Sequence, residues 1–99
     1  MGADSGRAGV LTPRVAHSVS LARQADRELR ALPARVVRRI RPAIDSLAET
    51  PRPRGTVKLG DDSYRIRVGT YRIIYDVDDR AKEVIILHVR HRKDAYRRR

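Results

Sequence analysis

Ninety-nine residues are enough for one domain with a modest core. The chain has no cysteine, which rules out disulfides and thiolate metal sites and fits a reducing compartment, and no apolar run approaches the roughly 20 residues of a membrane span. Basic residues outnumber acidic ones by 23 to 12, a net charge of +11, and 20 of the 23 are arginine. Such a field attracts polyanions, and arginine suits bidentate phosphate contacts, although an arginine-rich proteome would give the same excess.

The first half of the chain predicts a strand followed by two helices. Residues 1–14 hold three glycines and no periodicity, and we expect a disordered extension there. Alternating apolar residues predict a short strand at 15–21, and spacings of three and four predict a helix at 22–32, which ends at Leu32-Pro33. A second helix is predicted at 34–49, kinked at Pro42 and antiparallel to the first. Its expected buried stripe comprises Val36, Val37, Ile40, Ile44 and Leu47.

The second half predicts a small sheet. After a proline-rich break at 50–55, a period of two indicates strands at 64–68, 71–77 and 83–90. Gly69-Thr70 suits a type II′ hairpin turn, and residues 78–81 make the next turn. The predicted order is β-α-α-β-β-β. This is an α+β domain over residues 15–99, with a helical hairpin packed on one face of an antiparallel-rich sheet.

Strand parity separates an apolar face from a basic one. The face predicted to lie under the helices carries Tyr64, Ile66, Val68, Tyr71, Ile73, Tyr75, Val77, Ile85, Leu87 and Val89. The opposite face carries Arg65, Arg67, Arg72, His88 and Arg90, with Ile74, Val84 and Ile86, and with Arg92 if the strand runs on.

The two-residue turn predicts that Arg67 lies directly opposite Arg72, with Cβ atoms roughly 5 Å apart. Like charges so placed repel each other. Either the side chains splay into water or the pair binds an anion, for which phosphate is the common choice. We expect a phosphate site here.

Other groupings predict no metal and no cofactor. His88 and His91 are three residues apart, which places them on opposite faces of a strand, and Gly60-Asp61-Asp62 is interpreted as a loop. RNA can be cut without a metal when its own 2′-hydroxyl is the nucleophile, provided that the enzyme stabilises the charge on phosphorus and handles two protons. Arginine stabilises charge well but holds its own proton firmly. His88, His91 and Tyr96 are the alternatives for proton transfer, and Tyr96 can equally stack on a base.

Three stretches together resemble a known family. They are Lys58-Leu59-Gly60, YRIRVGTYRIIY at 64–75 and HRKDAY at 91–96, and the resemblance to the RelE branch of the RelE/ParE toxin superfamily extends over residues 17–97. The resemblance implies a RelE-like fold and a type II toxin-antitoxin toxin. It further implies a metal-independent endoribonuclease that cleaves mRNA in the A site of the 70S ribosome and leaves a 2′,3′-cyclic phosphate. It implies a RelB-like antitoxin, contact with operator DNA only through the antitoxin complex, no membrane, and the cytoplasm of a bacterium or archaeon.

The resemblance also assigns roles. Arg65 and Arg67 would hold the RNA and aid activation of the 2′-hydroxyl, and Arg72 would stabilise the scissile phosphate. Arg92 would protonate the leaving group, with Arg90 as the second candidate for that role, and Tyr96 would stack on the base. Further RNA contacts are expected from Lys58, Arg90, His91, Lys93 and Arg97. The family pattern has lysines where this chain has Arg65 and Arg67, which leaves the general base open.

Two other functions fit the sequence. The related ParE toxins share the fold and inhibit DNA gyrase by binding, without nuclease activity. A third reading is a basic protein that coats nucleic acid.

Overall fold

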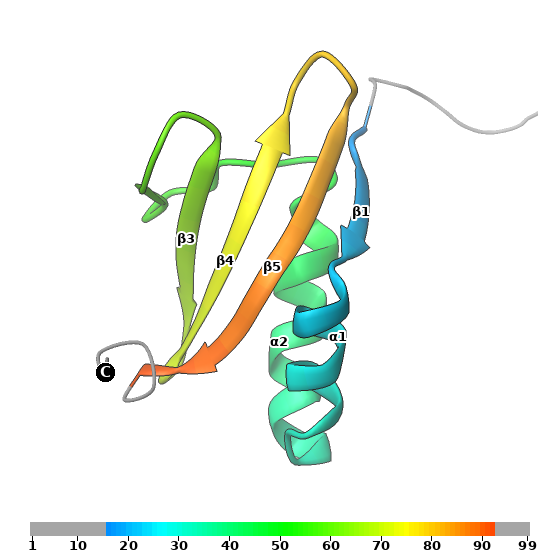
Figure 1. Cartoon of the computed structure of the whole chain (residues 1–99). Coiled ribbons are helices and arrows are strands. Elements are labelled where there is room, and N and C mark those ends of the chain that lie inside the picture. The colour runs from blue at the N-terminus through cyan, green and yellow to red at the C-terminus, as the bar shows by residue number, and fades with distance from the viewer. Residues whose placement is uncertain (1–15, 93–99) are drawn as a thin grey trace, which may run out of the picture.

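Five strands and two helices make up the computed structural model, which describes residues 16–92 (Figure 1). The elements are β1 Ser18–Leu21, α1 Arg23–Arg30, α2 Ala34–Ser46, β2 Val57–Lys58, β3 Ser63–Val68, β4 Tyr71–Asp78 and β5 Glu83–His91. The sheet order is β1-β5-β4-β3-β2, with β1 parallel to β5 and the other pairs antiparallel. The predicted α+β order is confirmed. The two-residue β2 was not predicted because so short a strand carries no periodicity, and the expected extension at 1–14 lies outside the described residues.

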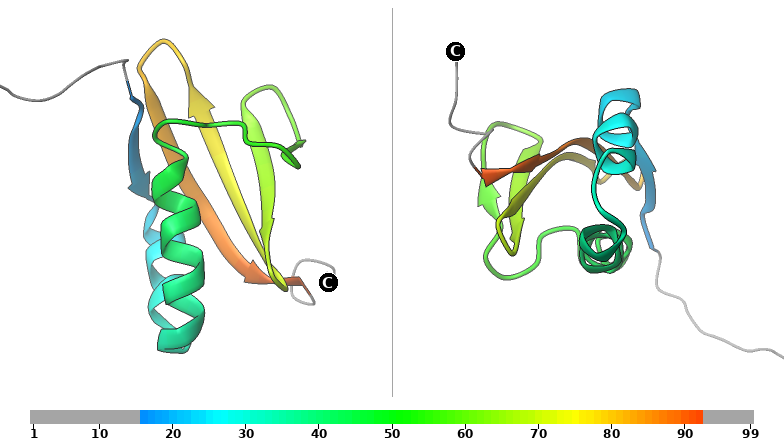
Figure 2. Two further views of the ribbon diagram at one scale, coloured as in Figure 1. Left: turned by 180° about the vertical axis from the view of Figure 1, so that it is seen from behind. Right: turned by 90° about the horizontal axis from the view of Figure 1, so that it is seen from below.

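The two helices bury most of the predicted apolar positions, whereas Val36 and Val37 of the predicted stripe are half-buried. Ala25 and Leu29 of α1 are buried, and so are Ile40, Ile44 and Leu47 at the end of α2. The right-hand view of Figure 2 shows α2 below the sheet and α1 close to the edge of the sheet. There α1 packs on β5 beyond the end of β1. The α-helical part of α2 continues through Pro42 to Ser46. The predicted helix reached residue 49, and amide bonds to carbonyls three residues back continue as far as Glu49, which is a tightened last turn.

A β-bulge in β5 corrects the predicted core. Ile74 pairs with His88 but Tyr75 pairs with Ile86, so Leu87 is an extra residue in the ladder. Val84 and Ile86 are therefore completely buried, whereas strict alternation predicted them on the opposite face. Ile85 and Leu87, predicted in the core, are half-buried. That part of the prediction was wrong because one inserted residue reverses the parity of everything before it.

The β3–β4 turn has the geometry that the sequence predicts. Gly69 has φ +62°. Among residues 16–92, Lys82 is the one non-glycine residue with positive φ, so Thr70 has the negative φ that a type II′ turn requires. Val68 pairs with Tyr71 and Arg67 with Arg72, which confirms the predicted register.

The opposite end of the sheet is held by a small polar cluster. The carboxylate of Asp79 accepts a hydrogen bond from Arg52 at 2.7 Å and lies 3.1 Å from His17 Nε2. Bonding to Arg52 and then to His17 lowers the pKa of Asp79. The cluster joins the loop after α2, the β4–β5 turn and the start of the chain's first strand. None of the helices in the described part of the chain is long and apolar enough to cross a membrane.

Candidate nucleic-acid interface

Three arginines stand side by side across three strands. Arg67 of β3 lies directly opposite Arg72 of β4, and Arg72 lies directly opposite Arg90 of β5. We call these three residues the arginine row. It lies at the end of the sheet where the β3–β4 turn and the end of β5 meet (Figure 1), and its strand positions alternate with those that form the core. The predicted pairing of Arg67 with Arg72 thus extends to a third cation.

A second row runs parallel to the first on the same face. Arg65 pairs with Ile74, and Ile74 pairs with His88. Arg65, His88 and the arginine row are the residues that parity predicted on this face. The structure therefore brings Arg65, Arg67, Arg72, His88 and Arg90 together.

The centre of the arginine row is buried. Among residues 16–92, Arg72 is the one charged residue that is buried, with an exposed fraction of 5%. Like charges directly opposite each other on neighbouring strands repel. An anion held between them converts that repulsion into attraction, and a phosphate group offers oxygens to both guanidinium groups. The row therefore places three guanidinium-bearing residues side by side, with the middle one buried.

A carboxylate from α1 anchors one end of the row. Glu28 Oε2 accepts a hydrogen bond from Arg90 Nε at 3.0 Å, and Oε1 accepts one from the Val89 amide at 2.8 Å. This amide needs a partner because β1 ends at Leu21, which leaves the edge of β5 beyond Ile86 without a neighbouring strand. Gln24 also donates to Glu28, at 3.2 Å.

The hydrogen bonds to Glu28 together lower its pKa by more than burial raises it. Burial raises the pKa of Glu28, whereas the bonds from Val89, Arg90 and Gln24 lower it, and the net pKa lies below the ordinary value. The side chain is 17% exposed and carries a negative charge at neutral pH. Sequence reasoning missed this residue. The available signal was a carboxylate directly beside the buried Leu29 in the helical stripe.

The remaining predicted site residues lie elsewhere. Arg92 is exposed, and its amide donates to Thr70 O at 2.6 Å, which continues the β4–β5 ladder past His91. The register places His91 opposite Tyr71, with the two rings edge to face at 5.1 Å. It places Lys58 opposite Tyr64, so neither His91 nor Lys58 shares the face of the arginine row. Lys93, Tyr96 and Arg97 lie outside the described residues.

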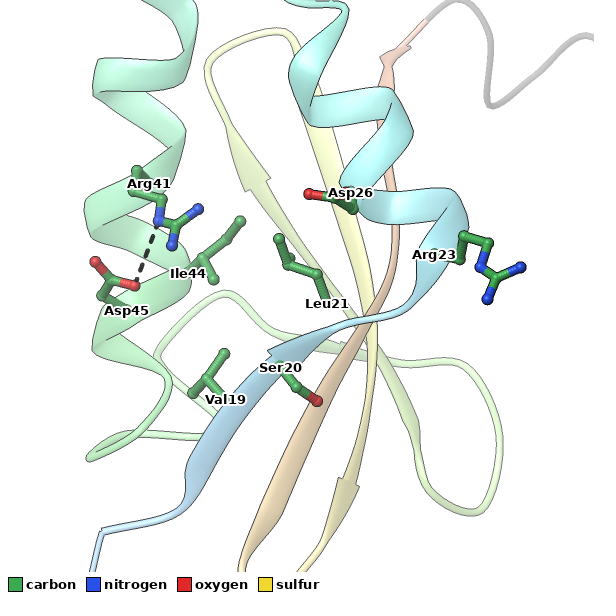
Figure 3. Close-up of a pocket in the computed structure, with 8 residues that line it drawn as sticks. All are labelled: Val19, Ser20, Leu21, Arg23, Asp26, Arg41, Ile44 and Asp45. Atoms are coloured by element: carbon green, nitrogen blue, oxygen red, sulfur yellow. Dashed lines mark ion pairs between the residues drawn. The ribbon is translucent and has the colours of Figure 1, made fainter.

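A groove between β1 and α2 has a different chemistry. Val19, Leu21 and Ile44 form its apolar floor (Figure 3). Its rim carries both signs of charge, including Arg41 and Asp45, which lie 3.8 Å apart as an ion pair. The groove therefore lacks the single-sign field of the arginine row. Within residues 16–92, His, Asp and Glu side chains do not gather in groups of three or more that could hold a metal ion.

The fold and this surface define a small α+β protein whose sheet carries arginines in register on three neighbouring strands. Comparison with known proteins gives the family. Residues 19–96 match the family described as the ParE toxin of the type II toxin-antitoxin system parDE. Toxin RelG of Mycobacterium tuberculosis is 34% identical over 89 residues, which cover 83% of this chain and 98% of RelG.

Solved structures agree with that assignment. The RelBE2 toxin-antitoxin complex of Mycobacterium tuberculosis contains a chain with a TM-score of 0.70 and 32% identity, covering 79% of this chain and 100% of that one. The archaeal RelE-RelB complex of Pyrococcus horikoshii gives a TM-score of 0.68 and 31% identity, covering 78% and 96%. The chain belongs to the RelE/ParE superfamily of type II toxin-antitoxin toxins.

Proposed function

We propose that this toxin is a metal-independent endoribonuclease that cuts mRNA in the A site of the ribosome. The observation that carries the proposal is the arginine row, in which three cations lie in register with the buried Arg72 at the centre. Attack of a 2′-hydroxyl on the adjacent phosphorus gathers negative charge on the phosphate oxygens, and guanidinium groups placed around that phosphate stabilise the charge. In this arrangement Arg67 and Arg72 hold the scissile phosphate and Arg65 lies beside the attacking 2′-hydroxyl.

Other residues would complete the substrate site. We assign leaving-group protonation to Arg92, whose backbone is fixed to Thr70, and base stacking to Tyr96. Further contacts with the RNA on either side of the cut codon would come from Lys58, His91, Lys93 and Arg97. Because Arg90 is hydrogen-bonded to Glu28, we assign Arg90 to holding phosphate and not to donating the proton.

A RelB-like antitoxin is the proposed partner. Two of the structural relatives are toxin-antitoxin complexes, and a net charge of +11 favours an acidic protein partner as well as RNA. We propose that the antitoxin neutralises the toxin in the cytoplasm and that the toxin reaches operator DNA only within that complex.

Mapping mRNA 5′ ends in a translating extract tests the function. Added toxin is expected to give cuts in phase with codons, and a gyrase supercoiling assay run alongside is expected to show no inhibition. Loss of supercoiling with intact mRNA would instead favour the ParE-like activity, and neither effect would point to a coating protein.

Arg67→Ala tests the site within the same assay. Arg67 is exposed, so its loss should leave the fold intact. RNA affinity should fall, and the slope of log affinity against log salt concentration should decrease by the amount expected for about one lost phosphate contact. Arg80→Ala is the matched control, because Arg80 is also exposed but lies in the turn between β4 and β5, at the opposite end of the sheet. Equal behaviour of the two variants would show that the site is wrongly placed.

A further inference from the structure

The proposed cleavage needs a proton acceptor that arginine cannot supply. Arginine holds its proton firmly in proteins, so an arginine can hold the 2′-hydroxyl but is a poor acceptor of its proton. An imidazole on the same face is the natural alternative, since it exchanges protons near neutral pH. His88 is the imidazole that the strand register places there, in the row that also contains Arg65.

Glu28 orients that imidazole. His88 Nδ1 is buried and lies 3.5 Å from Glu28 Oε1, while a third of the His88 side chain is exposed. The nitrogen available to a ligand is therefore Nε2. A carboxylate facing Nδ1 favours the tautomer that carries its proton on Nδ1, and this leaves the Nε2 lone pair free to accept a proton. At 3.5 Å this contact is not a hydrogen bond, and Nδ1 has no hydrogen-bond partner within residues 16–92; catalytic contacts that are long without substrate commonly tighten when it binds.

We infer that His88, oriented by Glu28, is the general base of the cleavage reaction, an assignment that rests on the proposed ribonuclease function. His88 Nε2 accepts the proton of the 2′-hydroxyl as the 2′-oxygen forms its bond to phosphorus. The bond from phosphorus to the 5′-oxygen breaks, and its electron pair leaves with that oxygen. The 5′-oxygen receives a proton from Arg92, which recovers one from solvent, or directly from water. The products are a 2′,3′-cyclic phosphate and a 5′-hydroxyl, and the imidazolium returns its proton to solvent.

Charged groups of both signs surround His88. Glu28 faces it from α1, Arg90 stands two residues along β5, Arg72 lies diagonally across on β4, and Arg65 lies beyond Ile74 on β3. The Glu28 carboxylate is placed to stabilise the imidazolium that forms during the reaction. Glu28 thus acts twice, once on His88 and once by holding Arg90 in the arginine row.

The test uses the full-length toxin and purified 70S ribosomes programmed with a defined mRNA, and it follows cleavage in a single turnover between roughly pH 5 and 8, where imidazoles titrate. His88→Gln is expected to lower the rate about 10²- to 10⁴-fold, the range for loss of a general base, and to abolish the acidic limb of the pH profile. RNA affinity should stay within about threefold, because the arginine row is unchanged. His17→Gln, which removes an imidazole from the Asp79 cluster at the other end of the sheet, should retain the full rate and the limb.

Glu28→Gln separates orientation from structure. Glutamine keeps one oxygen that can accept the hydrogen bond from the Val89 amide, whereas its NH2 group cannot accept the bond from Arg90, so the fold is expected to remain with a modest loss of stability. The missing negative charge should move the acidic limb to lower pH and reduce the maximal rate about tenfold. A purely structural role for Glu28 would change stability without moving the limb, and that result would overturn its assignment as the positioning residue.

A sulfur-substituted substrate distinguishes a base from an acid. In an mRNA with a bridging 5′-phosphorothiolate at the cut site, the leaving thiolate needs no proton. The His88→Gln defect should persist with this substrate if His88 is the base, and rescue of the rate would overturn the assignment. If wild-type toxin cuts and His88→Gln cuts equally well with the same pH profile, this inference alone falls. If wild-type toxin does not cut at all, the proposed function falls with it.

Discussion

Replacing Glu28 with alanine is expected to destabilise the fold far more than a typical change on a helix surface. The carboxylate is 17% exposed and joins α1 to β5 through the Val89 amide and Arg90 Nε. Alanine leaves that amide without an acceptor at a point where β1 no longer covers β5, because β1 ends at Leu21. It also removes a counter-charge from one end of the arginine row.

The magnitude follows from the lost contacts. An unsatisfied buried amide costs about 1 to 3 kcal/mol, and a hydrogen bond between charged groups contributes about 1.5 to 3 kcal/mol. The Arg90 side chain is 38% exposed, so solvent screens its pairing with Glu28 and the smaller value applies. Alanine recovers about half a kcal/mol through its helix propensity. The free energy of unfolding should therefore fall by about 2 to 4 kcal/mol, which in a domain of this size lowers Tm by about 10 to 30 °C.

Urea and thermal unfolding followed by circular dichroism measure this change. Asp26→Ala is the matched control, because Asp26 lies on the same helix and pairs with Arg30 at 3.1 Å, but both side chains are exposed. An exposed pair of this kind contributes about 0 to 1 kcal/mol. If Glu28→Ala lost no more stability than Asp26→Ala, Glu28 would not be joining α1 to the edge of β5.

Three further changes have defined outcomes. Because the pKa of Glu28 is lowered in the folded state, its contribution to stability is complete above about pH 4.5 and disappears as the pH falls through the folded pKa, so wild type and Glu28→Gln should converge in urea midpoint under acid. Gly69→Ala should cost about 1 to 2 kcal/mol in urea unfolding, since φ is +62° and an Arg39 nitrogen lies 3.3 Å from the new Cβ; an unchanged midpoint would contradict the turn. Tyr75→Phe removes the buried donor to Pro51 O at 2.7 Å and should lower Tm by an amount equivalent to about 1 kcal/mol.

The arginine pair could be predicted from sequence because it depends on a local feature. Gly69 allows a two-residue turn, and that turn decides which residues face each other on the two strands that it joins. Arg67 and Arg72 lie within two residues of it, so no long-range information is needed. The observed pairing matches the prediction.

The role of Glu28 could not be predicted in the same way. Its partners Val89 and Arg90 are 61 and 62 residues away in the chain. The contact forms because β1 pairs with only the first half of β5 and the chain then turns into α1. Neither the length of that parallel pairing nor the place where it ends leaves a periodic signal in the sequence. The same holds for β2, whose two residues are a strand only because β3 lies beside them.

The bulge at Leu87 explains both the failed part of the parity prediction and the position of the basic face. The run Val84-Ile85-Ile86-Leu87 is apolar throughout, so either set of alternate residues can form the core. The structure buries Val84 and Ile86. Without the extra residue, the same parity would direct His88 and Arg90 into the core, where an unpaired charge is costly. The bulge instead buries Val89 and leaves His88 and Arg90 in register with Ile74 and Arg72. One inserted residue thus lets a single strand supply the core with its first half and the proposed RNA site with its second.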